Sequence, residues 1–143
     1  MGELPEQRPR DVTVLDMEAS IEHLTRGTVR NVDALLVVTE PYFRSLETSG
    51  RVIPLARELG LERVWIVANK VRSDRDEAAI REYCARRGFE VVGLVPFDEA
   101  VGEADLRGQS LIDYQAAASA VRAVEQLADL LTDRLRTGAS VGV

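Results

Sequence analysis

The chain has 143 residues, 45% of them apolar and 29% charged, and its formal net charge is −6. This length and composition are typical of one soluble globular domain, and the negative charge disfavours non-specific binding to nucleic acid or an anionic membrane. Cys84 is the only cysteine, which excludes an intrachain disulfide and a metal site made of several cysteines of one chain. No apolar run approaches the roughly 20 residues of a membrane-spanning helix, and residues 1–10 lack the apolar stretch of a signal peptide. We therefore expect a cytoplasmic protein, with neither nucleic acid nor a membrane as its partner.

Apolar segments of strand length alternate along the chain with segments that favour helices. The strands are expected at residues 12–15, 34–39, 63–68 and 90–95. The helices are expected at residues 21–29, 45–59, 74–87, 98–106 and 114–135. Such alternation predicts an α/β fold of three layers (α/β/α), in which helices cover both faces of a mainly parallel sheet. The domain itself is expected at residues 11–136, between a disordered or extended lead-in at 1–10 and a frayed tail at 137–143.

Some segments carry more specific expectations. Residues 34–39 read ALLVVT, a continuous apolar run that is typical of a strand covered on both faces. The strand at residues 12–15 is also expected to be buried. Ser20 and Ser45 are the expected N-caps of the first two helices. Pro54 lies inside the second helix, where a proline costs about 3 kcal/mol, so we expect a bend or a break just before it.

A carboxylate, Asp16, ends the first expected strand, and Glu18 follows it in a short loop. Open α/β sheets bind ligands at the carboxyl ends of their strands, where nucleotide-binding folds place an acid that holds Mg²⁺ or its waters. In this interpretation Asp16 is the acid of a Walker B strand and residues 18–20 sense a γ-phosphate, which makes Asp16 and Glu18 the candidate catalytic residues. The alternative is an Asp that only caps the following helix.

Two further polar segments follow later strands. Asn69 and Lys70 come after the strand at 63–68, and the Asn amide offers a donor and an acceptor that suit the edge of a purine, with the Lys stem along the flat face of the base. The alternative is a polar turn, in which Asn is common. Residues 95–100 read VPFDEA and follow the next strand, beside the same site. Their alternative is a turn with Asp98 as a helix N-cap.

The sequence contains no loop that grips phosphates. A P-loop needs a Gly-rich turn followed by Lys and then by Ser or Thr, whereas the only lysine, Lys70, lies between Asn69 and Val71. His23 stands alone on an expected helix and Cys84 has apolar neighbours, so we expect no set of metal ligands within the chain.

Several stretches together resemble one family: DMEASIEHLTRGTVRNVDALLVVTEP, SLETSGRV, VANKV and LVPFDEAVGEADLRGQSL. They are similar to the carbon monoxide dehydrogenase maturation ATPases, the CooC-type nickel-insertion proteins among the MinD/ParA-like P-loop ATPases. The resemblance extends over residues 11–131, although the family usually has Gly where this chain has Ser20. It implies an ATP-binding protein that handles ATP or ADP together with Mg²⁺.

The resemblance also implies a role for each candidate residue. Asp16 matches the Walker B acid, and residues 18–20 match the switch turn. Asn69 matches the Asn that reads adenine, with Lys70 beside it. The loop that closes over the base is matched by Pro96, Phe97 and Asp98.

Part of the family's site has no counterpart here. Family members carry a P-loop and a Cys-x-Cys pair upstream of the matched region. The Cys-x-Cys pair is shared across a dimer that forms with nucleotide. The chain therefore resembles the C-terminal half of such an ATPase. In the family the P-loop strand lies between the strands matched by residues 12–15 and 34–39. Those two strands are therefore expected to pair directly, to be bridged by a second chain, or to need a separate N-terminal segment.

The sequence leaves two functions open. In the first, the chain is the adenine-binding and Mg²⁺-positioning part of a nickel-insertion ATPase and is inactive alone. Its partners are then an N-terminal P-loop-bearing segment or a second copy, and carbon monoxide dehydrogenase. In the second, it is a non-catalytic interaction or regulatory module that kept the fold. The presence of Asn69, Lys70 and residues 96–98 favours the first function, and Ser20 in place of Gly slightly favours the second.

Overall fold

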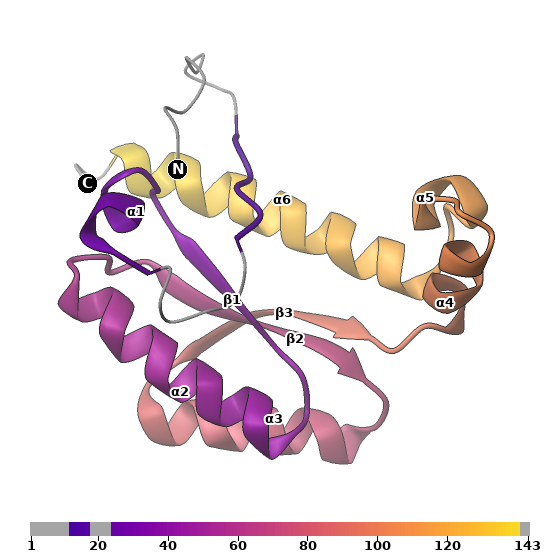
Figure 1. Ribbon diagram of the computed structural model, residues 1–143, viewed down its shortest axis with the longest axis horizontal. Helices are drawn as coiled ribbons and strands as arrows, with labels where there is room; N and C mark the ends of the chain where they lie inside the picture. Colours follow the sequence, from indigo (N-terminus) through magenta and orange to yellow (C-terminus); the bar gives the residue numbers. More distant parts are fainter. Residues whose placement is uncertain (1–11, 18–23, 141–143) are drawn as a thin grey trace.

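The computed structural model describes residues 12–17 and 24–140, with side chains up to residue 135 (Figure 1). Within these ranges, three strands form one parallel sheet in the order β1-β2-β3. The strands are β1 (Leu35–Thr39), β2 (Val64–Val71) and β3 (Glu90–Pro96). The helices are α1 (Arg26–Arg30), α2 (Phe43–Glu58), α3 (Asp74–Arg87), α4 (Glu99–Leu106), α5 (Leu111–Tyr114) and α6 (Ser119–Ser140).

Helices pack on both faces of the sheet. The helices α2 and α3 connect successive parallel strands and lie on one face, while α6 packs against β3 on the other face (Figure 1). The main core lies between the sheet and the α2 and α3 helices, where Ile53, Ile66 and Ile80 are at most 1% exposed. Burying a side chain of this size contributes about 1.5–3 kcal/mol. The predicted three-layer α/β/α fold is confirmed.

The helix α3 has the bounds that the sequence predicted. The hydroxyl oxygen of Ser73 caps it by accepting a hydrogen bond from the backbone N–H of Asp76 at 3.2 Å. Carboxylates of the first turn, including that of Asp74, lie near the positive end of the helix dipole, where negative charge is favourable. Gly88 ends the helix with a φ of 68°, a left-handed conformation that costs glycine little.

The expected strand at residues 12–15 is wrong for this structure. Residues 12–17 contain no strand, and the side chains of Val12 and Val14 are 56% and 85% exposed. Direct pairing of this segment with residues 34–39 is excluded, because β1 pairs with β2 alone among the described strands. An apolar run is buried as a strand only where a neighbouring strand and a covering layer exist, and the described sheet ends at β1.

The strand β1 is not covered on both faces, contrary to expectation. Leu36 and Val38 are 37% and 59% exposed, whereas Leu35 and Val37, which point to the opposite face, pack against the main core. The helix that packs on the exposed face, α6, lies against β3, at the far edge of the sheet. Two apolar side chains of β1 are consequently left open on the α6 side.

The helix α2 is continuous, and the expected break at Pro54 is wrong. Ile53 and Ala56 flank this proline and are both 0% exposed. Their burial offsets part of the cost of a mid-helix proline, about 3 kcal/mol. The helix begins at Phe43 after Tyr42, so Ser45 lies inside it and is not its N-cap.

Other helix ends also differ from expectation. The helix α1 begins after Thr25, whose Oγ1 accepts a hydrogen bond from the N–H of Thr28 at 3.2 Å, and is shorter than the expected helix at 21–29. Its expected cap, Ser20, and the lead-in at 1–10 lie outside the described residues. The short α5 was not predicted, and it delays the start of α6 from residue 114 to 119. No helix in the described ranges combines the length and apolarity that crossing a bilayer requires.

Candidate functional site

The carboxyl-terminal edge of the sheet brings together polar residues from all three strands. Glu40 follows β1, residues 69–70 lie in the last part of β2, and residues 96–98 lie at and after the end of β3. In parallel sheets this edge is where ligands bind. Five of the seven candidate residues from the sequence therefore lie on adjoining strand ends, as expected.

The strand β2 bulges at Asn69 and Lys70. Ala68 pairs with Leu94 and Val71 with Pro96, so two residues of β2 stand opposite one residue of β3. Lys70 has a φ of 56°. Among the described residues, it is the only one other than glycine with a positive φ. The strand was expected to end at residue 68, before these two residues, and this expectation is wrong: β2 resumes pairing at Val71. Bulges of this kind re-aim side chains and are frequent beside binding sites.

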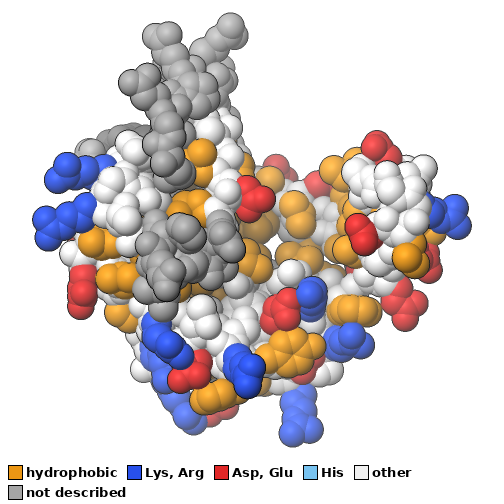
Figure 2. All heavy atoms as spheres, viewed as in Figure 1, with side chains coloured by type: hydrophobic (Ala, Val, Ile, Leu, Met, Phe, Trp, Pro, Cys, Tyr) orange, Lys and Arg blue, Asp and Glu red, His pale blue; other side chains and the backbone are white. Residues whose placement is uncertain are grey.

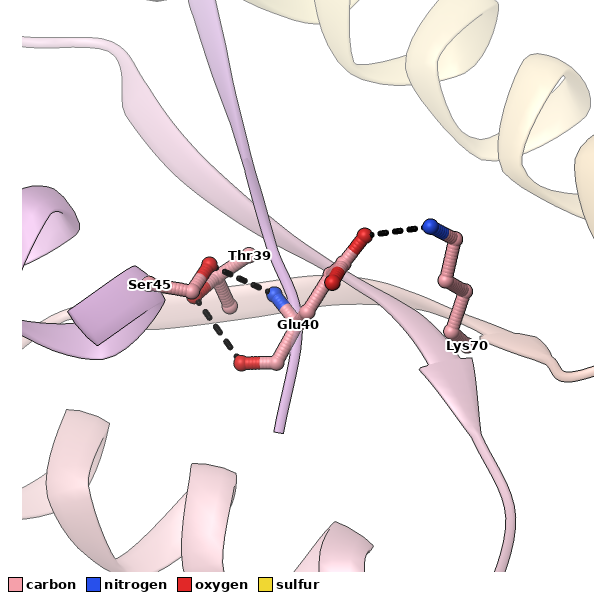
Figure 3. Close-up of polar contacts among 4 residues, drawn as sticks. All are labelled: Thr39, Glu40, Ser45 and Lys70. Atoms are coloured by element: carbon pink, nitrogen blue, oxygen red, sulfur yellow. Dashed lines mark hydrogen bonds and ion pairs between the residues drawn. The ribbon is translucent and has the colours of Figure 1, made fainter. Parts of the chain in front are cut away.

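An ion pair connects the ends of β1 and β2. Nζ of Lys70 lies 2.7 Å from Oε1 of Glu40, and the two side chains are 52% and 32% exposed (Figure 3). The carboxylate of Glu40 raises the pKa of Lys70, through its hydrogen bond first and its charge second. The charge of the sole lysine of the chain is thus balanced by Glu40. The residues around this lysine do not form the sequence of a P-loop.

Glu40 is itself held by the first turn of α2. Its backbone N–H donates to Oγ of Ser45 at 2.9 Å, and the same Oγ lies 3.1 Å from Oγ1 of Thr39, which is fully buried (Figure 3). Ser45 therefore closes the turn between β1 and α2, in place of the capping role that the sequence suggested.

Asn69 lies near the carboxyl end of β2, and Phe97 directly follows β3. The Asn69 side chain is half-buried, and its amide has no hydrogen bond to another described residue. The Phe97 backbone N–H donates to the carbonyl of Val71 at 2.9 Å, which ties it to the end of β2. Its ring is 38% exposed, and the guanidinium carbon of Arg72 lies 3.8 Å from the ring centroid. The Asn69 amide thus has no described partner for its donor and acceptor, and it lies at the same edge of the sheet as Phe97.

Asp98 has a capping role. Its carboxylate accepts hydrogen bonds from the N–H of Ala100 at 3.0 Å, the N–H of Ala120 at 3.1 Å and the hydroxyl of Ser119 at 3.0 Å. The bond from Ala120 is the first cause that lowers the pKa of Asp98. The alternative interpretation of Asp98 as an N-cap is confirmed, and the carboxylate also fixes the start of α6 to the end of β3.

Of the two candidate catalytic residues, the structure describes Asp16 alone. Asp16 is exposed in the segment 12–17, and no hydrogen bond or ion pair links it to Asn69 or Lys70. Glu18 lies outside the described residues. In the part of the chain that the structure describes, no three His, Cys, Asp or Glu side chains are grouped closely enough to hold a metal ion.

Sequence reasoning missed Glu40, Ser45 and Arg72. A usable signal existed for two of them, because Glu40 comes directly after the run 34–39 and Arg72 directly after β2, at the same edge as Asn69. The pairing of Glu40 with Lys70 had no such signal, since the two residues are 30 positions apart and meet only through the pairing of β1 with β2.

The chain is similar to known nucleotide-binding proteins. Residues 3–112 match the family described as the CobQ/CobB/MinD/ParA nucleotide binding domain. The carbon monoxide dehydrogenase accessory protein CooC of Rhodospirillum rubrum is 40% identical over 108 residues, which cover 76% of this chain and 40% of that protein. An uncharacterized ATP-binding protein of Methanocaldococcus jannaschii is also 40% identical over 108 residues, covering 75% of this chain and 42% of the relative. The chain thus spans less than half the length of these relatives.

Solved structures of the same kind share the fold. A ParA family ATPase from Chlorobium tepidum superposes with a TM-score of 0.62 at 25% identity, over 78% of this chain and 46% of the other. The cell division ATPase MinD of Pyrococcus furiosus superposes with a TM-score of 0.58 at 26% identity, over 71% of this chain and 43% of the other. The resemblance found in the sequence is confirmed. The match over residues 3–112 shows that the chain belongs to the CobQ/CobB/MinD/ParA family of nucleotide-binding domains.

Proposed function

We propose that this chain forms the base-binding side of the ATP site of a maturation ATPase, of the kind that inserts nickel into carbon monoxide dehydrogenase. A segment outside these 143 residues, in the same polypeptide or in another, supplies the P-loop; we call it the P-loop segment. The chain alone then hydrolyses no ATP. We place this activity in the cytoplasm and expect the assembled ATPase to work as a dimer.

The observation that carries this proposal is the Asn69 amide. It is half-buried, it has no hydrogen bond to another described residue, and it lies on β2, next to β3, which ends one residue before Phe97. A half-buried amide retains unused hydrogen-bonding capacity, which a bound base would satisfy. Asp16 is assigned the Walker B role and Glu18 the switch role by family resemblance, and Lys70, Pro96, Phe97 and Asp98 are assigned to the base by the same resemblance.

The open side of β1 supports a missing segment. β1 is an edge strand of the described sheet, and its side chains Leu36 and Val38 are exposed on the face that α6 leaves free. Figure 2 shows hydrophobic side chains exposed in several places on the face that it views, interspersed with charged ones. An edge strand with exposed apolar side chains favours the addition of another strand. A P-loop strand at this edge would complete the sheet and bring the phosphate-binding loop to the same end as Asn69.

The named client of the assembly rests on one relative. The protein from Rhodospirillum rubrum is an accessory protein of carbon monoxide dehydrogenase, and the identity of 40% covers three quarters of this chain. We infer a related client for the assembled ATPase. Nickel-dependent activation of the apo-dehydrogenase by MgATP and the assembled ATPase would support this; equal activation without the ATPase would contradict it.

A second function has its own supporting observation. Lys70 is occupied by Glu40, and Asp98 by the N-termini of α4 and α6, so two residues that the resemblance assigns to the nucleotide have internal partners. This favours a regulatory module that kept the fold and does not bind nucleotide.

Calorimetry separates the two functions. MgATP and MgADP are titrated into the chain alone and into the chain with the P-loop segment, with Asn69→Ala as the test variant. The control variant is Asn31→Ala, because Asn31 is exposed and precedes β1, at the opposite edge of the sheet. We expect binding only with the P-loop segment, weakened about tenfold by Asn69→Ala and unchanged by Asn31→Ala. No heat in any mixture would favour the regulatory module. Steady ATP turnover by the chain alone that disappears in Asp16→Ala would overturn the proposal.

A further inference from the structure

The backbone of Lys70 adopts a conformation that its side chain disfavours. Its φ of 56° lies in the left-handed region, which a residue with a Cβ adopts at a cost and glycine adopts freely. The distortion is part of the bulge between Ala68 and Val71, so the residue before it, Asn69, takes its direction from the same bulge. Such conformations persist where surrounding contacts hold them.

One ionic contact holds this residue from outside its own strand. The Glu40 carboxylate meets the Lys70 ammonium at 2.7 Å, from a position fixed by the bond between the Glu40 N–H and Oγ of Ser45 (Figure 3). Figure 3 shows the two side chains extended toward each other across the gap between the ends of β1 and β2. A partly exposed pair adds little to overall stability, but this one links the end of β1 directly to the residue with positive φ in the bulge.

We propose that Glu40 is a positioning residue, which holds Lys70 in the left-handed conformation and thereby aims the Asn69 amide at the base. This inference rests on the proposed function, which supplies the nucleotide base as the ligand. The mechanism rests on the geometry of the Glu40–Lys70 pair. Glu40 does not touch the nucleotide. Its effect is on which base is accepted, because a paired donor and acceptor distinguish adenine from guanine only when the amide is correctly oriented.

The first test needs no nucleotide. In the chain alone, the three-bond HN–Hα coupling and the ¹³C shifts of Lys70 report its φ by NMR. Glu40→Ala and Glu40→Gln should shift these values toward those of an ordinary strand, with the larger shift in Glu40→Ala. The control is Glu47→Gln, which breaks the comparable exposed pair between Glu47 and Arg51 in α2 and should leave Lys70 unchanged. An unchanged Lys70 in Glu40→Ala would overturn the inference.

The second test measures base selectivity with the P-loop segment present. The ratio of the dissociation constants for MgGTP and MgATP should fall about fivefold in Glu40→Ala and stay unchanged in Glu47→Gln. Lys70→Gly supplies an independent check, since glycine needs no tether to adopt a positive φ. In a Lys70→Gly background, Glu40→Ala should have no further effect on selectivity. If Glu40→Ala instead acted by unfolding the chain, its effect would remain in this background.

The outcomes distinguish this inference from the proposed function. Nucleotide binding by the unaltered chain with an unchanged selectivity ratio in Glu40→Ala overturns the role of Glu40 and leaves the proposed function intact. Absence of nucleotide binding by the unaltered chain, even with the P-loop segment, overturns the proposed function and the base-reading role of Glu40 together.

Discussion

Oδ2 of Asp98 lies 3.1 Å from the backbone nitrogen of Ala120, and this hydrogen bond fixes the start of α6 to the loop that follows β3. The other carboxylate oxygen, Oδ1, accepts from Ala100 N in the first turn of α4. One side chain therefore satisfies the open N-termini of two helices that are separated along the chain by α5.

The first prediction is that Asp98→Ala lowers the thermal unfolding midpoint by about 5 °C, because two helix N-termini lose their acceptor. Asp98→Asn should retain part of the stability, since its amide oxygen still accepts one bond. The measurement is calorimetric or circular-dichroism unfolding at neutral pH. Equal midpoints for Asp98→Ala and the unaltered chain would contradict the double capping role.

The second prediction concerns pH. The pKa of Asp98 is lowered in the folded chain, first by the bond from Ala120, so it lies below the value of about 3.9 for an unfolded Asp. The stability that Asp98 contributes is therefore fully present above pH of about 4 and is lost as the pH falls through the folded pKa. The difference in stability between the unaltered chain and Asp98→Asn should shrink as the pH falls below about 4. Urea unfolding of both proteins at neutral and acid pH measures it, and a constant difference would count against this linkage.

The third prediction concerns the contact between β3 and α6. A Cβ at Gly93 would lie 2.9 Å from Cδ1 of Leu127, so a larger side chain at residue 93 must displace this leucine. We expect Gly93→Val to lower the free energy of unfolding by about 1–3 kcal/mol. Leu127→Ala in the same chain should reduce the cost of Gly93→Val, because it removes the obstructing methyl groups. Strictly additive effects in denaturant unfolding would refute direct contact.

The fourth prediction concerns the open side of β1. Val38 is 59% exposed, so Val38→Lys should change the free energy of unfolding of the chain alone by no more than about 0.5 kcal/mol. It should weaken association with the P-loop segment at least about tenfold, because a charge would be buried against the added strand. Val101→Lys, on α4 at a residue that is 48% exposed, is the matched control. Undiminished association of Val38→Lys, measured by sedimentation, would place the contact elsewhere.

The fifth prediction concerns Cys84. Burial raises the pKa of its thiol, and its side chain is 1% exposed in the core beneath α3. Thiolate is the reactive form, so a thiol reagent at pH of about 8 should label the folded chain slowly and the urea-unfolded chain rapidly. Rapid and complete labelling of the folded chain would show that this part of the core opens readily.

Local signals predicted much of the fold. The bounds of α3 were predictable because Ser73 and Gly88 mark its ends in the sequence, and β3 was predictable because an apolar run stops at a proline. The strand β2 was predicted too short, since Asn69 and Lys70 resemble a turn. Its continuation depends on pairing of Val71 with a residue far along the chain, which composition does not record.

The candidate site likewise has a part that local sequence signals predicted and a part that they did not. The meeting of Asn69 with Phe97 at one edge followed from parallel strands and was predictable. The segment 12–17 has the composition of a buried strand, yet its burial depends on neighbours that the described chain does not supply. No local signal therefore distinguishes a buried strand from an exposed segment here. The Glu40–Lys70 pair joins residues from two different strand ends, and no local sequence signal indicates it.

Lys70 is the only lysine in the sequence, and 52% of its side chain is exposed. Amine-directed chemistry therefore has one side-chain target in this chain, and that target lies beside Asn69. Reductive ¹³C-methylation would place a single side-chain reporter at the carboxyl edge of the sheet, with the α-amino group as its only companion signal. The scarcity of lysine makes this edge directly observable in a mixture with other polypeptides.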